Sequence, residues 1–285
     1  MAKHEEIFIS YVDGTNPFTL RQAELKDRYA FVCACSKCQL GGSQCEDAFS
    51  KPASQLSSGL PRSGLHAYEQ RDFASNPAFA VGETIEEKRL SGLQGSVFRA
   101  LESARNDKDS HAAGQKCEEI MRICHDSGLW PLTRQPYAAA RDELFARMCA
   151  DGKPSIALGH GIRRHFSIDP MLYEQDFHPV RVVHAWALVK VLMWLYGRPE
   201  DPQTQAMLRA GFDFVVPIWR LLRTLRLLVR KSHGEDSRFA SEVEEMAEEI
   251  RGEMLRSGPD SVNLIERDPG DHWKTFEAWK DAPIY

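Results

Sequence analysis

Residues 29–38 have the sequence Tyr-Ala-Phe-Val-Cys-Ala-Cys-Ser-Lys-Cys, which places Cys33, Cys35 and Cys38 within six positions. Zinc prefers four sulfur or nitrogen ligands in a tetrahedron at about 2.0–2.3 Å, and thiolates are good zinc ligands. The spacing therefore predicts three of the four ligands of a Zn²⁺ site. The alternative that the spacing leaves open is three unliganded thiols, because small cysteine side chains are also common in protein cores.

The fourth ligand of such a site has two candidates. Cys45 follows Cys38 beyond Gly41-Gly42, so a flexible loop brings its thiol back to the cluster, and His4 precedes the cluster. The alternative for Cys45 is an exposed free thiol in a loop. Three further cysteines are predicted to be core thiols on apolar helix faces: Cys117, Cys124 and Cys149.

The composition excludes several classes of protein. A hydrophobic content of 42% and a charged content of 27% are typical of a globular chain. A net charge of −5 gives no basis for direct nucleic-acid binding. The apolar stretch 182–196 is interrupted by His184 and Lys190 and is shorter than a bilayer span of about 20 residues, so no membrane association is expected. An odd number of cysteines without a signal peptide favours an intracellular protein of the nucleus or cytoplasm.

The chain changes character along its length. Residues 39–82 are rich in glycine, serine, proline and glutamine and lack periodicity, which predicts a flexible linker. From residue 83 onward, apolar residues recur at steps of three and four, which is typical of amphipathic helices. The expected helices cover residues 83–106, 111–127, 135–150, 154–166, 179–196, 208–229 and 237–255.

Two details of these helices carry separate expectations. The helix over 179–196 is apolar on nearly every side, so we expect it to lie at the centre of its domain. The helix over 208–229 is expected to kink at Pro217. The tail 258–285, with Trp273, Phe276 and Trp279, is expected either to pack against the last helices or to remain loose.

Three polar groups have plain structural interpretations. His178 and His184 are six residues apart, which is not the spacing of two metal ligands on one helix, and this favours a capping histidine and a hydrogen-bonded core histidine. Gly159-His160-Gly161, followed by Arg163 and Arg164, lacks the preceding strand of a dinucleotide site, and we predict a helix junction with a basic surface.

An arginine stripe lies at three- and four-residue steps along one predicted helix: Arg220, Arg223, Arg226 and Arg230. Such a stripe is expected to face solvent or to pair with the acidic helix over 242–249.

The N-terminal segment resembles the end of a SET domain and its post-SET zinc segment, as found in protein-lysine methyltransferases of the SET and MYND type. In that family a Ser-Tyr-Ile-Asp-like strand end precedes an Arg/Leu-rich helix and then Tyr-x-Phe-x-Cys-x-Cys-x-x-Cys. Here residues 10–13 are Ser-Tyr-Val-Asp, and the match covers residues 5–38. Residues 130–137 and 173–186 look like those of fungal SET-domain proteins with helical C-terminal domains.

The resemblance implies roles for individual residues. Tyr11 falls on the catalytic tyrosine, Tyr29 on an aromatic residue that lines the channel for the target lysine, and Phe31 on the residue that packs against the adenine of S-adenosylmethionine. It also implies zinc at the three cysteines and a lysine-containing peptide as substrate. The alternative for Tyr11 and Phe31 is packing within a strand and the core, which is the commoner use of aromatic side chains.

The sequence also departs from the family. The Gly-x-Gly cofactor loop and the Asn-His-Ser-Cys segment, whose cysteine is the family's fourth zinc ligand, are both absent, and the one Gly-x-Gly, Gly159-His-Gly161, lies in a helical region. The expectation is therefore the C-terminal part of a longer methyltransferase, inactive alone. The alternative is a helical-repeat interaction module with a vestigial SET segment.

The expected fold is mainly α. It comprises a short strand over 7–11 and the post-SET segment in residues 1–38, the linker 39–82, a tetratricopeptide-like helical domain over 83–257 and the tail 258–285. No clean 34-residue repeat supports the tetratricopeptide likeness.

Overall fold

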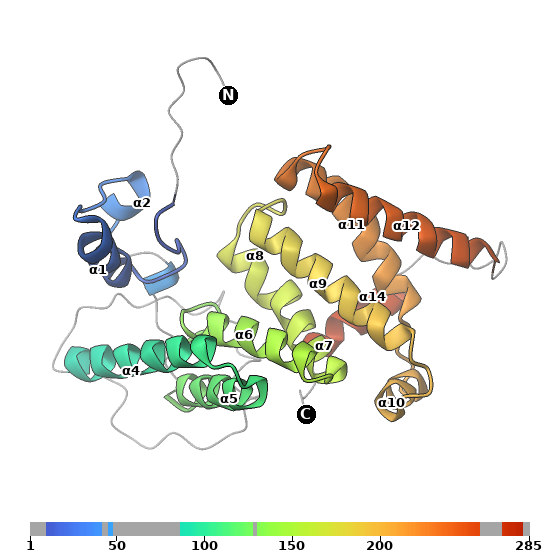
Figure 1. The fold of residues 1–285 in the computed structure, drawn as a ribbon, viewed down its shortest axis with the longest axis horizontal. Coiled ribbons are helices and arrows are strands. Elements are labelled where there is room, and N and C mark those ends of the chain that lie inside the picture. Colours follow the sequence, from blue (N-terminus) through green and yellow to red (C-terminus); the bar gives the residue numbers. More distant parts are fainter. Residues whose placement is uncertain (1–9, 42–44, 48–85, 128–129, 257–269, 282–285) are drawn as a thin grey trace, which may run out of the picture. The chain divides into compact units, whose positions relative to one another are not determined.

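The computed structural model describes residues 10–41, 45–47, 86–127, 130–256 and 270–281, and the regular structure in these ranges is helical, without a strand (Figure 1). The chain is thus mainly α, as predicted. The expected strand over 7–11 and the linker 39–82 fall mostly outside the described residues. The helices divide into two compact units, one formed by residues 1–106 and 116–140 and the other by residues 107–115 and 141–285. The domain boundaries and the tetratricopeptide likeness stay predictions.

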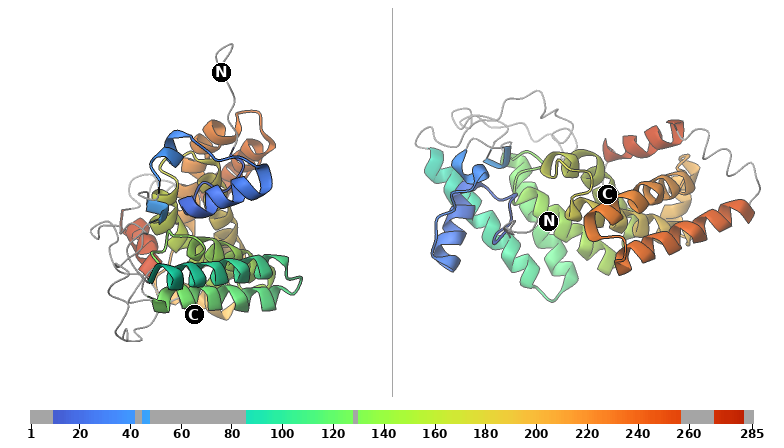
Figure 2. Two further views of the ribbon diagram at one scale, coloured as in Figure 1. Left: turned by 90° about the vertical axis from the view of Figure 1, so that its left-hand side faces the viewer. Right: turned by 90° about the horizontal axis from the view of Figure 1, so that it is seen from above.

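The first unit contains the N-terminal segment and a pair of long helices. Its elements are α1 (Phe18–Tyr29), α2 (Ser36–Gln39), a 3-10 turn (Cys45–Asp47), α4 (Glu86–Asn106) and most of α5 (Ser110–Ser127). Helices α4 and α5 run side by side in Figures 1 and 2, and Lys116 Nζ donates a hydrogen bond to Ser103 Oγ at 3.2 Å. Cys117 and Cys124 on α5 are fully buried, which confirms them as core thiols.

The second unit contains the remaining helices. In chain order they are α6 (Tyr137–Ala150), α7 (Pro154–Arg163), a π-helical turn (Arg164–Ile168), α8 (Asp169–Leu172), α9 (Pro179–Tyr196), α10 (Pro202–Arg209), α11 (Val215–His233), α12 (Arg238–Arg256), α14 (Gly270–Ala278) and a 3-10 turn (Trp279–Asp281). Helix α9 packs against α7 and α11, and α11 packs against α12 (Figure 1). Cys149 on α6 is half-buried.

Helix α9 is the central element of the second unit, as its sequence predicted. Leu188, Val189 and Leu192 are fully buried. The helix begins at Pro179, three residues before the apolar stretch starts, and has 18 residues. It is the one helix in the described part of the chain that is long and apolar enough to cross a membrane by length and composition. A buried core helix satisfies the same criteria.

The predicted helix over 208–229 with a kink at Pro217 was wrong. Helix α10 ends at Arg209, Gly211 adopts a positive φ of 82°, and α11 begins anew at Val215. Asp213 Oδ1 accepts hydrogen bonds from the N–H groups of Val215 at 2.8 Å and Val216 at 3.1 Å, which stabilises the start of α11. Pro217 lies in the first turn, where its missing N–H has no intrahelical partner to lose.

The part of the tail that the structure describes, residues 270–281, packs onto the second unit, and the rest of the predicted tail lies outside the described residues. Trp273 and Phe276 on α14 contact Phe166, with ring centroids 5.4 and 5.5 Å apart. The Arg220 guanidinium lies 4.4 Å from the Trp273 ring centroid, a favourable cation–π distance. The aromatic residues of the tail therefore complete the core of this unit.

The arginine stripe on α11 pairs with the acidic helix. Arg226 Nε donates to Glu244 Oε2 at 2.9 Å and Nη2 lies 3.6 Å from Glu248, while Arg230 lies 3.5 Å from Glu244. The pairing with residues 242–249 is thus confirmed for Arg226 and Arg230, and Arg223 faces solvent.

Gly161 on α7 packs tightly against side chains of α6 and α9. A Cβ at this position would lie 3.0 Å from Phe145 Cε2 and 3.1 Å from Leu188 Cδ1. We expect Gly161→Ala to lower the free energy of unfolding by about 1–3 kcal/mol through overpacking, measured by chemical denaturation. Gly92→Ala on α4 is the matched control, since a Cβ there meets nothing within 4 Å, and it is expected to be neutral or stabilising. Equal stability of both variants would contradict the prediction.

Candidate metal centre and aromatic cluster

The end of α1 shapes the candidate site. Ala30 follows the helix in the left-handed conformation, with φ 58° and ψ 29°, and its N–H donates to the Lys26 carbonyl at 3.1 Å. A left-handed residue at this position ends a helix and turns the chain sharply. This turn lies between Tyr29 and Phe31 and therefore determines the relative positions of their two aromatic rings.

Tyr11, Tyr29 and Phe31 lie together in the structure. The ring centroid of Tyr11 is 5.0 Å from that of Tyr29 and 5.7 Å from that of Phe31, with tilted and edge-on geometries that aromatic pairs favour. The three side chains are 50%, 43% and 38% exposed, so they form a surface cluster and are not core residues. The residues that the sequence placed at one site are therefore neighbours, and their roles stay predictions.

The three cysteines also converge. The sulfur atoms of Cys33, Cys35 and Cys38 lie within 4.8 Å of one another, and none of them is in a disulfide. Tetrahedral coordination with Zn–S bonds near 2.3 Å separates sulfurs by about 3.8 Å, so a small contraction suffices. The donor set and its geometry thus fit three corners of a zinc site.

Local hydrogen bonds hold the cysteine loop in place. The Gln22 side chain on α1 donates from Nε2 to the Cys33 carbonyl at 2.9 Å and accepts from the Cys33 N–H at 3.0 Å. Gln39 N–H donates to the Cys35 carbonyl at 2.9 Å and closes the single turn of α2. The backbone around the sulfurs is therefore fixed by α1 on one side and by α2 on the other.

The thiols have different environments. The nearby backbone N–H of Cys38 is the main cause that lowers the pKa of Cys35, which is exposed. Burial raises the pKa of Cys38. Of the two candidates for a fourth ligand, the side chain of Cys45 and all of His4 lie outside what the structure describes.

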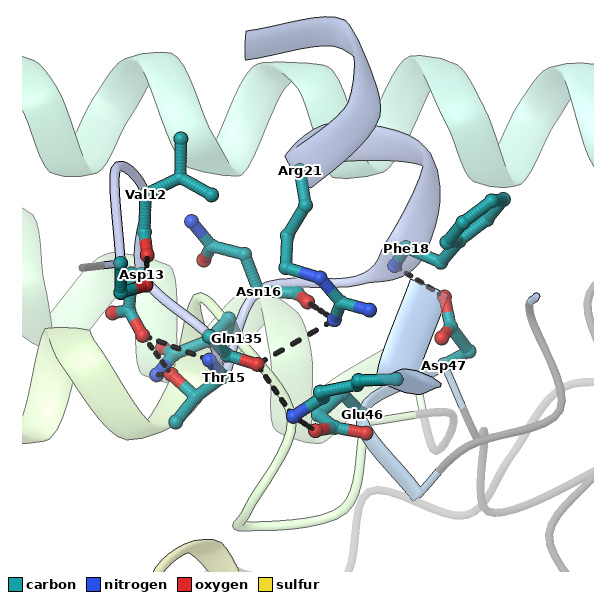
Figure 3. A network of polar contacts seen from close by, with 12 residues as sticks. Val12, Asp13, Thr15, Asn16, Phe18, Arg21, Glu46, Asp47 and Gln135 are labelled. Carbon is teal, nitrogen blue, oxygen red and sulfur yellow. Dashed lines mark hydrogen bonds and ion pairs between the residues drawn. The ribbon is translucent and has the colours of Figure 1, made fainter. Parts of the chain in front are cut away.

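A network of polar contacts around the loop before α1 was not predicted (Figure 3). Asp13 Oδ1 accepts hydrogen bonds from Thr15 N–H at 2.8 Å and from Thr15 Oγ1 at 2.7 Å, and Gln135 Nε2 donates to Thr15 Oγ1 at 2.9 Å. Asp47 Oδ1 accepts from the Phe18 N–H at 2.8 Å and so caps the start of α1. The loop before α1 is thereby attached to Gln135, which lies 120 positions after Thr15 in the chain.

Arg134 anchors the same network from the other side. Its Nη1 donates to the Glu46 carbonyl at 2.7 Å and its Nη2 to Gln94 Oε1 at 2.8 Å. Burial lowers the pKa of Arg134 to about 10 and raises the pKa of Asp47. Trp130 and Gln135 in the same turn are also buried, and Trp130 Nε1 donates to the Gln135 carbonyl at 3.1 Å.

His178 and His184 have structural roles in capping and hydrogen bonding, as their spacing favoured. His178 Nδ1 accepts from the Val180 N–H at 3.3 Å and caps the helix. His184 Nδ1 contacts the buried Asp169 carboxylate at 3.0 Å. Residues Gly159–Gly161 lie within α7 and not at a junction between helices, and the basic surface predicted there was also wrong, because Arg163 and Arg164 are buried.

Comparisons with known proteins identify no family for this chain. No family model matches the sequence, and no curated protein is similar to it at a significant level.

Proposed function

We propose that this chain is the C-terminal part of a protein-lysine N-methyltransferase of the SET and MYND type and that it is inactive by itself. The observation that carries the proposal is the contact of Tyr11 with Tyr29 and Phe31, directly before the cysteine cluster in the chain. Exposed aromatic rings suit such a site, because their faces attract the sulfonium of S-adenosylmethionine and the ammonium of lysine and exclude water.

Each residue has a defined task in this proposal. Methyl transfer is an in-line displacement at a sulfonium, so the protein mainly positions the two reactants. Tyr11 directs its phenol toward the transfer centre, Tyr29 forms a wall of the lysine channel, and Phe31 packs against the adenine. Zinc held by the three cysteines supplies structural stability to the loop that carries Phe31.

The chain is inactive alone because its sequence lacks the family's Asn-His-Ser-Cys segment, and its one Gly-x-Gly, Gly159-His160-Gly161, lies more than 100 residues after the aromatic residues. Binding of S-adenosylmethionine is accordingly expected to be weak. The substrate in the proposal is a lysine-containing peptide of an intracellular protein.

The test is titration of the zinc-loaded chain with S-adenosylmethionine, followed by NMR of labelled aromatic rings. We expect shift changes at Tyr11, Tyr29 and Phe31, and none at Trp194, which packs under Arg198 in the second unit. S-adenosylhomocysteine, which lacks the sulfonium charge, should bind more weakly, and Phe31→Ala should abolish the changes. No shift at the cluster at millimolar ligand would overturn the proposal.

Metal analysis of the same sample tests the zinc ligands separately. We expect one zinc per chain, lost in Cys38→Ser and retained in the control Cys149→Ser, whose thiol lies half-buried on α6. If the purified chain bound no zinc, the assignment of the three cysteines as zinc ligands would be contradicted.

A second candidate is a helical interaction module with a vestigial SET segment. It is favoured by exposed apolar side chains on the long helices of the second unit, above all Leu227 on α11, which is 68% exposed. A folded chain with neither zinc nor any response to S-adenosylmethionine is the result expected of this candidate.

A further inference from the structure

Cys35 and Cys38 lie close enough for their thiols to form a disulfide bond. Cys35 directly precedes α2 and Cys38 lies within it, and their sulfurs are within 4.8 Å of each other. Residues three apart on one helical turn have Cβ atoms about 5–6 Å apart, close to the range that a disulfide spans. Bond formation therefore needs side-chain rotation and a small backbone adjustment, and no large movement of α2.

The two thiols differ in access. Cys35 is exposed, whereas Cys38 is 9% exposed. Oxidation follows thiolate character and access, so Cys35 is the first thiol that a soluble oxidant meets. The backbone of Cys33 is restrained on both sides, because its N–H and its carbonyl are both hydrogen-bonded to the Gln22 side chain.

We propose that Cys35 and Cys38 form a reversible disulfide whose formation releases the bound zinc, which makes α2 a redox-sensitive modification site. This inference rests on the zinc site of the proposed function. A peroxide is the oxidant. The Cys35 thiolate attacks one peroxide oxygen, the O–O bond breaks, and the departing hydroxide takes up a proton to form water, which leaves a sulfenic acid.

The second step closes the pair. The Cys38 thiolate attacks the Cys35 sulfur, the S–S bond forms, the S–O bond breaks, and the departing hydroxide is protonated to a second water. The two cysteines together lose two electrons, and one hydrogen peroxide gains them. Cys33 is then the one thiolate of the cluster left to zinc, which is too few ligands for a structural site.

A side chain between the two cysteines connects this step to the rest of the first unit. Lys37 Nζ donates to the Gly14 carbonyl at 2.8 Å and forms an ion pair with Glu46. Any shift of α2 on oxidation therefore reaches the loop before α1 and the 3-10 turn that caps it. We expect faster amide exchange over residues 10–16 in the oxidised chain.

The experiment treats the zinc-loaded full chain with stoichiometric hydrogen peroxide. Zinc release is followed with a metallochromic dye, and disulfides are mapped by mass spectrometry after alkylation. We expect one zinc released for each Cys35–Cys38 disulfide, with reversal by dithiothreitol and added zinc. Cys149→Ser should behave as the unchanged chain, and Cys38→Ser should stop at a sulfenic acid on Cys35 that dimedone traps.

Two results would overturn the inference: a disulfide that involves Cys33 in place of this pair, or zinc retained after full oxidation. Because Cys38→Ser also removes a zinc ligand, disulfide mapping of the unchanged chain is the deciding readout. A chain that never binds zinc contradicts the proposed function and the coupling to metal release. In that case mapping of the oxidised chain still tests which two cysteines pair.

Discussion

Replacing Arg134 by alanine is expected to destabilise the first unit by about 2–4 kcal/mol. Arg134 is 1% exposed, and its guanidinium donates to the Glu46 carbonyl and to the Gln94 side chain. Truncation takes one donor from each acceptor and leaves a cavity of several methylene groups. The effect is measured as the free energy of unfolding, together with amide exchange of α1.

The matched control is Arg122→Ala on the solvent face of α5. Arg122 pairs with Glu119 and Asp126, but all three side chains are exposed, and such pairs contribute little. We expect no measurable change there. The Arg134→Lys chain should have an intermediate free energy of unfolding, because an ammonium keeps the charge but lacks the planar guanidinium that can donate to two acceptors at once. An Arg134→Ala chain as stable as Arg122→Ala would show that the network does not hold the N-terminal segment.

The helices were largely predictable because their periodicity is local. The start of α9 at Pro179, capped by His178, follows from proline at the first helical position. The break before α11 was missed because apolar residues continue on both sides of it. Gly211 and Asp213 just before Pro217 were the available signal, since glycine ends helices and aspartate favours their starts.

The buried arginines could not be predicted from local pattern. Charged residues are assigned to surfaces by default, since burial is rare unless they are paired. The partner of Arg134 is Glu46, 88 residues earlier, and nothing in either local sequence indicates the other. Arg164 likewise forms an ion pair with Asp142 on another helix, with its Nη1 atom 3.0 Å from Asp142 Oδ1. Such pairings depend on the tertiary fold alone.

One part of the candidate site could be predicted from neighbouring residues in the sequence, and the other part could not. The cysteine cluster was predictable from the spacing alone, because six consecutive positions supply all three sulfurs. The contact of Tyr11 with Tyr29 requires α1 to fold back, and only the resemblance to a family placed both at one site. The hydrogen bonds of Gln22 to Cys33 were not predicted, since a glutamine on a helix carries no pattern that indicates its partner.

Acidification from about pH 7 to about pH 5 is expected to destabilise the second unit through two histidines, the buried His160 and the half-buried His165, whose Nδ1 atom is buried. Burial lowers the pKa of His165 to about 4, and burial with the neighbouring Arg141, Arg163 and Arg164 holds the pKa of His160 well below its usual range. Arg141 Nη1 lies 3.2 Å from His160 Nδ1, a contact that a neutral imidazole accepts.

The sign follows from where the protons bind. Below about pH 6.5 the unfolded chain protonates both histidines while the folded unit keeps them neutral, so stability is lost as the pH falls toward the folded pKa. At pH 5 the loss from His165, whose folded pKa is about 4, is about 2 kcal/mol at 1.36 kcal/mol per pH unit, and His160 adds a loss in the same direction. Asp169 acts in the opposite direction, because burial raises its pKa and the folded form takes up that proton first.

Urea unfolding of the second unit at several pH values measures this dependence. His165→Leu should remove about 2 kcal/mol of the loss between pH 7 and pH 5, since it deletes one of the two titrating groups. His111→Gln, at an exposed position on α5, should leave the slope unchanged. If His165→Leu and His111→Gln gave the same slope, His165 could not be neutral in the folded chain, and the environment that the π-helical turn creates for it would have to be revised.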